Sequence, residues 1–134
     1  MTAAIQRLLG VIGYPTDSVS AGQGFVVIKV DGYPVRLSEG SGRLVLSCPL
    51  DIDGEEVFLR LVGYAAGRLL KEDATLAWDP RSQELILWQS VPAAAGEEAL
   101  RRVFEVFTAS CDWWIGRAKE DVTVSEIPQM MIRP

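Results

Sequence analysis

The sequence of 134 residues contains no histidine. Histidine is the side chain whose unperturbed pKa lies nearest neutrality, and it serves as the base in Ser-His-Asp and Cys-His catalytic groups and as a common metal ligand. Its absence excludes these mechanisms and every histidine-based metal site. We therefore expect no enzymatic activity, no bound metal and no cofactor.

Positive charge and long apolar runs are also scarce. The chain has 13 Lys and Arg residues against 18 Asp and Glu residues, which gives a formal net charge of -5. Nucleic acids and anionic membranes bind through clustered Lys and Arg, and the sequence shows no such cluster. No apolar stretch reaches the length of about 18 residues that a membrane-spanning helix requires. We expect a protein partner, with no nucleic-acid binding and no membrane insertion.

Cysteine is limited to Cys48 and Cys111, which lie 63 positions apart. The chain start shows no cationic segment followed by an apolar run and a small-residue cleavage site, so we expect a cytoplasmic protein and no disulfide-built scaffold. Both cysteines lie in apolar stretches, LVLSCPL and FTASCDWW. Their pattern predicts buried, reduced thiols that act as small hydrophobic side chains.

Hydrophobic periodicity and turn signals predict an α+β domain with an antiparallel sheet. Asp31-Gly32 is a strong hairpin signal, so the segment 33–39 is expected to be the second strand of a hairpin. Because Pro34 has no backbone N–H, either this strand lies at a sheet edge or Pro34 lies near its start. We expect one domain over residues 1–118, followed by a tail at 119–134 in which Val122, Val124 and Ile127 could add a short strand. The expected elements, in the order α-β-β-β-α-β-β-α, are a helix at 2–11, a loop at 16–24, strands at 25–30, 33–39 and 43–48, a helix at 54–70, strands at 74–79 and 84–90, and a helix at 96–117.

The helix expected at 54–70 is apolar around most of its circumference. A surface helix needs only one apolar stripe of about 100°, so this helix requires cover on two sides. A second subunit would supply that cover and make the protein a homodimer; deep burial within one chain is the alternative. Only Arg60 and Arg68 interrupt the apolar surface.

The strands at 84–90 and 25–30 are apolar on both faces. In the first, Ile86 and Trp88 alternate with two leucines, and Trp78 lies on the facing arm of the hairpin. Burial of Trp78 or Trp88 between subunits and simple core packing are both possible. In the second strand, Phe25 and Val27 face away from the other apolar residues. An apolar face beside an edge strand would hold an extended peptide, although all these residues could equally be core.

The order of elements and two stretches of sequence resemble the class I type III secretion chaperones, the Tir-chaperone or CesT-like family. The first stretch, LVLSCPLDIDGEEVFLRLVGYAAG, runs from the third strand into the middle helix. The second, TLAWDPRSQELILWQSVPAAAGEEALRRVFEVF, is a hairpin followed by a helix that opens with acidic residues. The resemblance covers about residues 2–117.

This resemblance implies a homodimer that binds the amino-terminal region of a secreted effector in extended form and delivers it to components of the secretion apparatus. Such a role needs no ATP and no bond chemistry. By the resemblance, the middle helix and second hairpin build the dimer, whereas the first helix and the sheet bind the effector. The implied dimer residues are Phe58, Leu61, Val62, Trp78 and Trp88, and the implied effector-binding residues are Ile5, Leu8, Leu9, Phe25, Val27 and Val35.

A second hypothesis keeps the fold and changes the role. A regulatory interaction module would sequester a secretion regulator or another chaperone instead of escorting cargo. Both roles use the same apolar faces, so the sequence leaves both open. The polar loop at 16–24 and the tail at 119–134 could set which partner binds.

Overall fold

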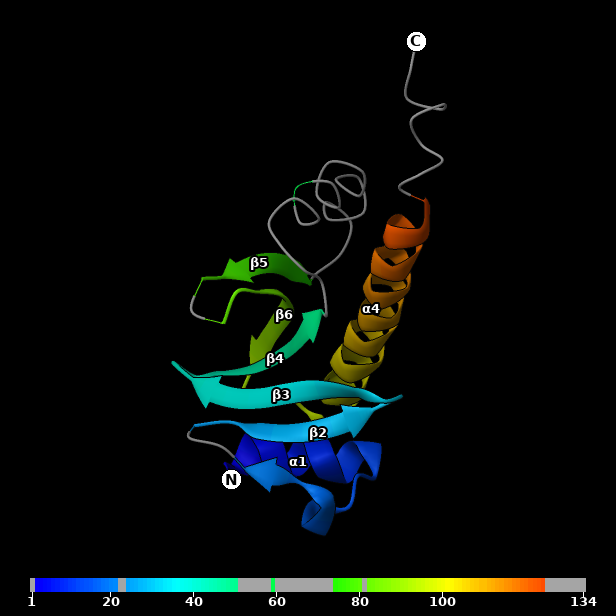
Figure 1. The fold of residues 1–134 in the computed structure, drawn as a ribbon. Coiled ribbons are helices and arrows are strands. Elements are labelled where there is room, and N and C mark those ends of the chain that lie inside the picture. Colours follow the sequence, from blue (N-terminus) through cyan, green and yellow to red (C-terminus); the bar gives the residue numbers. More distant parts are fainter. Residues whose placement is uncertain (1, 22–23, 51–58, 60–73, 81, 125–134) are drawn as a thin grey trace.

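The computed structural model describes residues 2–21, 24–50, 59, 74–80 and 82–124. Six strands form one antiparallel sheet in the order β1-β2-β3-β4-β6-β5, and Figure 1 shows β2 to β5 stacked in this order from bottom to top. The helix expected at 54–70 lies outside the described residues except for Leu59, which is helical. The elements are α1 (Ala3–Ile12), a 3-10 helix (Thr16–Ser18), β1 (Ser20–Ala21), β2 (Val26–Val30), β3 (Tyr33–Gly40), β4 (Arg43–Leu50), β5 (Thr75–Asp79), β6 (Glu84–Pro92) and α4 (Glu97–Val124).

The first helix begins and ends as its sequence predicts. Oγ1 of Thr2 accepts a hydrogen bond from the backbone N–H of Ile5 at 3.3 Å, which satisfies one of the free donors of the first turn. Gly13 ends α1 in the left-handed conformation, with φ of 72°, where a residue without Cβ is favoured. Between these caps, Leu8 and Leu9 bury one face of the helix against the sheet.

Two tight hairpins fix the register of the first half of the sheet. Asp31 and Gly32 have φ values of 50° and 88°, and Ser41 and Gly42 have values of 55° and 74°. Positive φ at both central residues is the requirement of a type I′ turn, whose twist matches that of the flanking strands. These turns confirm the predicted meander of β2, β3 and β4.

Two prolines mark the point where the pairing of β3 with β4 ends. The β3–β4 pairing runs from Gly40 opposite Arg43 to Arg36 opposite Ser47. Continuing this register by two residues would place Pro34 opposite Pro49, and neither residue has a backbone N–H to donate. The ladder therefore ends where both donors are missing. Pro34 is near the start of its strand, as predicted, and β3 lies inside the sheet.

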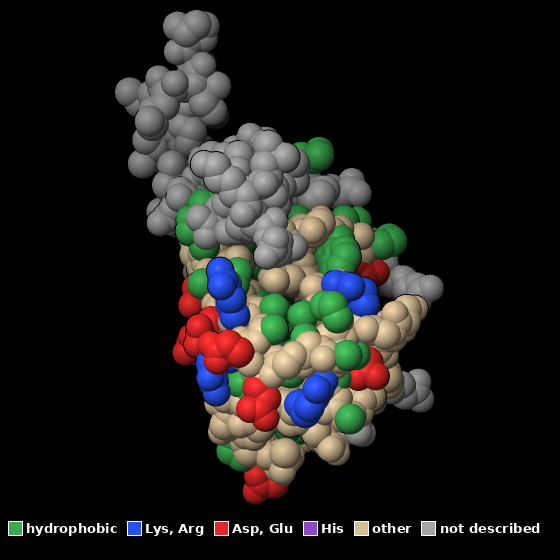
Figure 2. Space-filling view, turned by 180° about the vertical axis from the view of Figure 1, so that it is seen from behind, with side chains coloured by type: hydrophobic (Ala, Val, Ile, Leu, Met, Phe, Trp, Pro, Cys, Tyr) green, Lys and Arg blue, Asp and Glu red, His purple; other side chains and the backbone are tan. Residues whose placement is uncertain are grey.

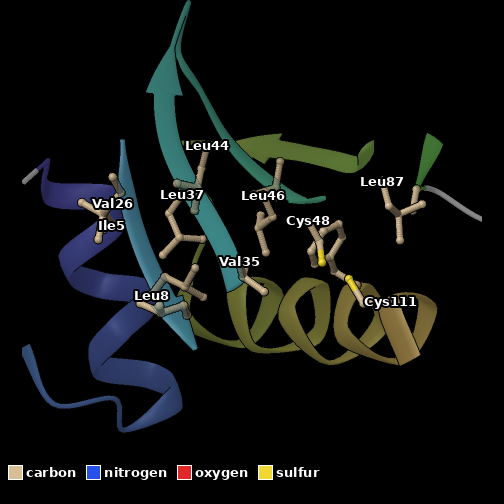
Figure 3. Packing of buried hydrophobic residues seen from close by; sticks show 14 of the residues in the cluster. Ile5, Leu8, Val26, Val35, Leu37, Leu44, Leu46, Cys48, Leu87 and Cys111 are labelled. Atoms are coloured by element: carbon tan, nitrogen blue, oxygen red, sulfur yellow. The ribbon is translucent and has the colours of Figure 1, made fainter. Parts of the chain in front are cut away.

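The helices α1 and α4 pack on one face of the sheet, which we call the inner face. On α4 the side chains of Leu100, Phe107, Cys111 and Trp114, at steps of three, four and seven residues, are fully buried and face the sheet. Figure 3 shows side chains of α1, the strands and α4 meeting in this core. The inner-face side chains of the strands are Val26, Ile28, Val35, Leu37, Leu44, Leu46, Cys48, Leu50, Leu85, Leu87, Gln89 and Val91.

Two expectations about connecting segments are wrong. The segment 16–24 was expected to be a loop, but it contains β1, in which Ser20 and Ala21 pair with Val27 and Val26. The helix expected at 96–117 is longer than predicted, because α4 continues to Val124. Val122 and Val124, which could have added a short strand to the tail, are therefore helical. No proline interrupts the chain there, and Arg, Ala, Lys and Glu at 117–120 all favour helix.

Candidate protein-binding face

The second face of the sheet, which we call the open face, carries the side chains that alternate with those of the inner face. No helix among the described residues packs on it, because α1 and α4 both lie on the inner face. An uncovered face of an antiparallel sheet is usually polar, yet apolar side chains interrupt this one. Its apolar and charged members include Phe25, Val27, Lys29, Arg36, Arg43, Val45, Asp79, Glu84, Ile86 and Trp88.

Large apolar side chains are exposed on the open face. Phe25 is 36% exposed and Trp88 is 38% exposed. Figure 2, seen from behind the view of Figure 1, shows the other side of the molecule, on which α1 and α4 lie and where basic and acidic side chains surround scattered apolar ones. Large apolar side chains that stay exposed beside charged ones are typical of a protein-interaction site.

Arg36 connects the aromatic and acidic groups of this face. Its guanidinium carbon lies 5.9 Å from the centroid of the Phe25 ring, within the range of a cation–π contact. Its Nη2 lies 3.8 Å from Oε2 of Glu84, and both side chains are 35% exposed. The contact with Arg36 also places Phe25, which precedes β2, on the open face. Partly solvated ion pairs of this kind contribute little to the stability of the fold. The guanidinium and the carboxylate are instead available for polar contacts with a partner protein.

One row of paired residues crosses the sheet and divides the open face into two ends. Val27 lies opposite Arg36, Arg36 opposite Ser47, and Ser47 opposite Trp88. Adjacent strands are about 4.8 Å apart, so Val27 and Trp88 are separated by roughly 14 Å. The polar residues Arg36 and Ser47 therefore separate an apolar end at β2, with Phe25 and Val27, from an apolar end at β6, with Ile86 and Trp88.

The backbone of β2 is already occupied at its outer side. Strand β1 pairs with the first part of β2, and the N–H of Lys29 donates a hydrogen bond to the hydroxyl oxygen of Tyr14 at 3.2 Å. Strand β2 is therefore not a free edge strand beside the apolar face. A partner at this end of the sheet would meet side chains of the open face more readily than backbone groups of β2.

The structure divides the predicted effector-binding residues between the two faces. Phe25 and Val27 lie together on the open face. The other four side chains pack in the core and leave almost no surface for an external partner. Their exposed fractions are 3% for Ile5, 1% for Leu8, 0% for Leu9 and 0% for Val35.

The predicted dimer residues also lie in different parts of the chain and of the sheet. Phe58, Leu61 and Val62 lie outside the described residues. Trp78 is opposite Leu85 and packs against the core on the inner face, whereas Trp88 is on the open face. The two tryptophans thus cannot share an interface on a single face of the sheet.

Several members of the open face, among them Arg36, Val45, Glu84 and Ile86, are absent from the predicted site. A sequence signal for Arg36 exists in the stretch YPVRLSE, where Arg36 and Ser38 alternate with Val35 and Leu37. Strict alternation puts the polar pair on the less covered face. The same signal assigns Val35 to the core.

In the described part of the chain, no three Cys, Asp or Glu side chains gather into a metal-binding group. None of its helices is both long enough and apolar enough to cross a membrane. The open face offers apolar contact together with cations, among them Arg36 and Arg43, and carboxylates such as Glu84, which is the chemistry of protein recognition.

The fold and the open face define a small α+β protein-interaction domain. The sequence model of the Tir chaperone protein (CesT) family matches residues 4–114. Because this match covers most of the chain, the chain belongs to the Tir chaperone protein (CesT) family. No match was found among curated proteins.

Solved structures with this fold include three complexes. The HopA1–SchA chaperone–effector complex contains a chain 19% identical, with a TM-score of 0.64, covering 81% of this chain and 88% of that one. The ExsC–ExsE complex gives 20% identity, a TM-score of 0.65, and coverage of 88% and 96%. The ExoT–SpcS complex from Pseudomonas aeruginosa gives 20% identity, a TM-score of 0.62, and coverage of 82% and 92%. At these identities the likeness establishes the shared fold.

Proposed function

We propose that this protein is a cytoplasmic, ATP-independent type III secretion chaperone. It binds the amino-terminal region of a secreted effector in extended form and keeps that region competent for secretion. Membership of a chaperone family supports this role, as do similar folds in complexes that include a chaperone with its effector. The proposal includes no enzymatic activity and no cofactor, because holding a segment extended requires no bond chemistry.

The open face is the observation that carries the proposal. Exposed Phe25 and half-buried Val27 lie at its β2 end, beside the guanidinium of Arg36. An extended segment presents side chains to alternate sides, so apolar residues on one side would contact Phe25 and Val27. We assign effector binding to this end of the open face.

We further propose a homodimer built by the segment 54–70, with Phe58, Leu61 and Val62, and by the β6 end of the open face at Trp88. Leu59, the one described residue of that segment, is helical and 66% exposed. This exposure supports an apolar surface that a second subunit would bury. Trp78 lies on the inner face and would join such an interface only around the β5 edge. The polar residues Arg36 and Ser47 separate the two assigned ends.

A binding experiment tests the effector proposal. The purified chain is titrated with the amino-terminal region of a secreted protein encoded beside its gene, and affinity is measured by calorimetry. The variant Phe25→Asp should weaken binding at least tenfold, because it puts a charge into an apolar contact. The control Val106→Asp changes an apolar residue of α4 that is 40% exposed, and it should leave affinity unchanged.

Equal affinities for the two variants would contradict the assignment to the open face. Failure of every secreted protein from the same locus to bind would contradict the chaperone role itself. Selective capture of a protein that is never secreted would favour the regulatory module instead.

Light scattering after size exclusion tests the dimer. The unaltered chain should elute with twice the chain mass, and Leu61→Asp should shift it toward the monomer, because an interfacial charge without a partner is costly. Phe25→Asp, at the other end, should remain dimeric. A monomeric unaltered protein at all concentrations would contradict the proposed assembly.

A further inference from the structure

The two cysteines of the chain meet in the core, although 63 positions separate them in sequence. Cys48 lies on the inner face of β4, and Cys111 lies on the buried stripe of α4. Both side chains are 0% exposed, and both are free thiols. Figure 3 shows their sulfur atoms pointing toward one another across the space between strand and helix. The fold therefore builds a thiol pair from distant segments.

The thiols are linked by a directed hydrogen bond. The Cys48 thiol donates to the carbonyl oxygen of Pro49 at 3.6 Å, and Cys48 accepts from Cys111. This hydrogen bond from Cys111 lowers the pKa of Cys48, against the opposing effect of burial. The same bond, together with burial, raises the pKa of Cys111. Cys48 is thus the sulfur that loses its proton first, and the thiolate is the reactive form.

We propose that Cys48 and Cys111 are a redox modification site, which closes to an intrachain disulfide when the protein reacts with a hydroperoxide. The sulfur of Cys48 attacks one peroxide oxygen, the O–O bond breaks, and water leaves from hydrogen peroxide or an alcohol from an organic hydroperoxide, so that Cys48 becomes a sulfenic acid. The sulfur of Cys111 then attacks the sulfenic sulfur, the S–O bond breaks, and water leaves. With hydrogen peroxide, two thiols are oxidised and the peroxide is reduced to two waters.

The placement of the pair determines what the bond does. A disulfide between β4 and α4 joins the sheet to its longest helix and closes a loop that contains β5 and β6. Closing a long loop restricts the unfolded chain and raises stability. Because both thiols are fully buried, the oxidant reaches them only through local opening of the core, which makes the reaction slow. A dithiol reductant reverses it by exchange. The inference stands independently of effector binding.

The test uses the full-length protein, reduced and then exposed to hydrogen peroxide. After an acid quench, free thiols are alkylated under denaturing conditions and the chain is analysed by intact mass and peptide mapping. We expect a mass lower by two hydrogen atoms and one peptide pair that joins Cys48 to Cys111. The melting temperature should rise by roughly 5 °C and return to its original value with dithiothreitol.

Three results would overturn the proposal: both thiols still free after prolonged exposure, links only between different chains, or only sulfinic and sulfonic acids at either cysteine. Matched variants Cys48→Ala and Cys111→Ala should each abolish the change in melting temperature. If either variant keeps that change, the disulfide is not its cause. Peptide mapping of the unaltered protein decides the question even where a variant folds poorly.

Discussion

The inner and open faces of the sheet are made by the same strands, yet their side chains lie in different environments. On β3, Val35 and Leu37 are fully buried against the helices, whereas Arg36 between them reaches a partly exposed phenylalanine and a glutamate. The inner face is thus held by close packing, and the open face retains apolar and charged groups with free surface. Each strand contributes to stability through one set of alternate residues and to recognition through the other.

The face on which an apolar strand residue lies decides whether it stabilises the core or can contact a partner. Val27 and Val35 lie in neighbouring strands and have the same side chain, but only Val27 is on the face that a partner can reach. An apolar side chain indicates function in this protein only where the helices leave it uncovered. The same substitution should therefore lower the free energy of unfolding on the inner face and weaken effector binding on the open face.

Among these variants, Leu8→Asp in α1 is expected to cause the largest loss of stability. Leu8 is 1% exposed, so the variant would bury a carboxylate without a partner and should lower the free energy of unfolding by more than about 4 kcal/mol. Circular dichroism during urea titration measures it. The control Gln6→Asp, on the exposed side of the same helix, should change stability little. A folded Leu8→Asp protein that has lost only effector binding would show that α1 leaves the inner face.

Smaller losses of stability are expected for Val35→Ala and Val27→Ala. Val35→Ala should lower the free energy of unfolding by about 2 kcal/mol, because it removes fully buried methyl groups and leaves a cavity. Val27→Ala, on the open face, should cost less than about 1 kcal/mol and instead weaken effector binding. Urea unfolding and calorimetry measure the two quantities. Equal costs of unfolding for both variants would remove the distinction between the faces.

The smallest effect is expected for Arg36→Gln. Its cation–π contact with Phe25 and its partly solvated ion pair with Glu84 together should contribute about 0.5 kcal/mol. The loss should shrink in high salt, because salt screens the pair. Arg101→Gln is the matched control, since Arg101 pairs with Glu98 at 3.3 Å on exposed α4 without an aromatic contact. A loss above about 2 kcal/mol would mean that Arg36 supports the fold itself.

Much of the fold could be predicted because its signals are local. The cap at Thr2, the left-handed turn residues at Asp31 and Gly32, and the apolar stripe of α4 each act within a few residues of sequence. The extension of α4 to Val124 and the short β1 were missed. In both cases the sequence signal is weak, because a two-residue strand has no period and the sequence after 117 has no sustained apolar period.

The candidate site could be predicted only in part. The turn at Asp31-Gly32 already fixes Val27 opposite Arg36, so the sequence held the information that separates Val27 from Val35. The separation of Trp78 from Trp88 follows in the same way from the pairing of β5 with β6. The side on which α1 packs has no such local signal, so the sequence could not indicate that Ile5, Leu8 and Leu9 are buried against the sheet.

The sequence by itself determined that the protein has no histidine chemistry, that its charge disfavours nucleic acid, and that its elements alternate as an antiparallel α+β domain. These properties depend on composition and on short-range backbone preferences. Only the tertiary structure decided which face of the sheet the two helices cover, and hence that Phe25 and Trp88 retain exposed surface. It also brought Cys48 and Cys111 together. Both outcomes depend on contacts between segments far apart in the chain, which no local pattern encodes.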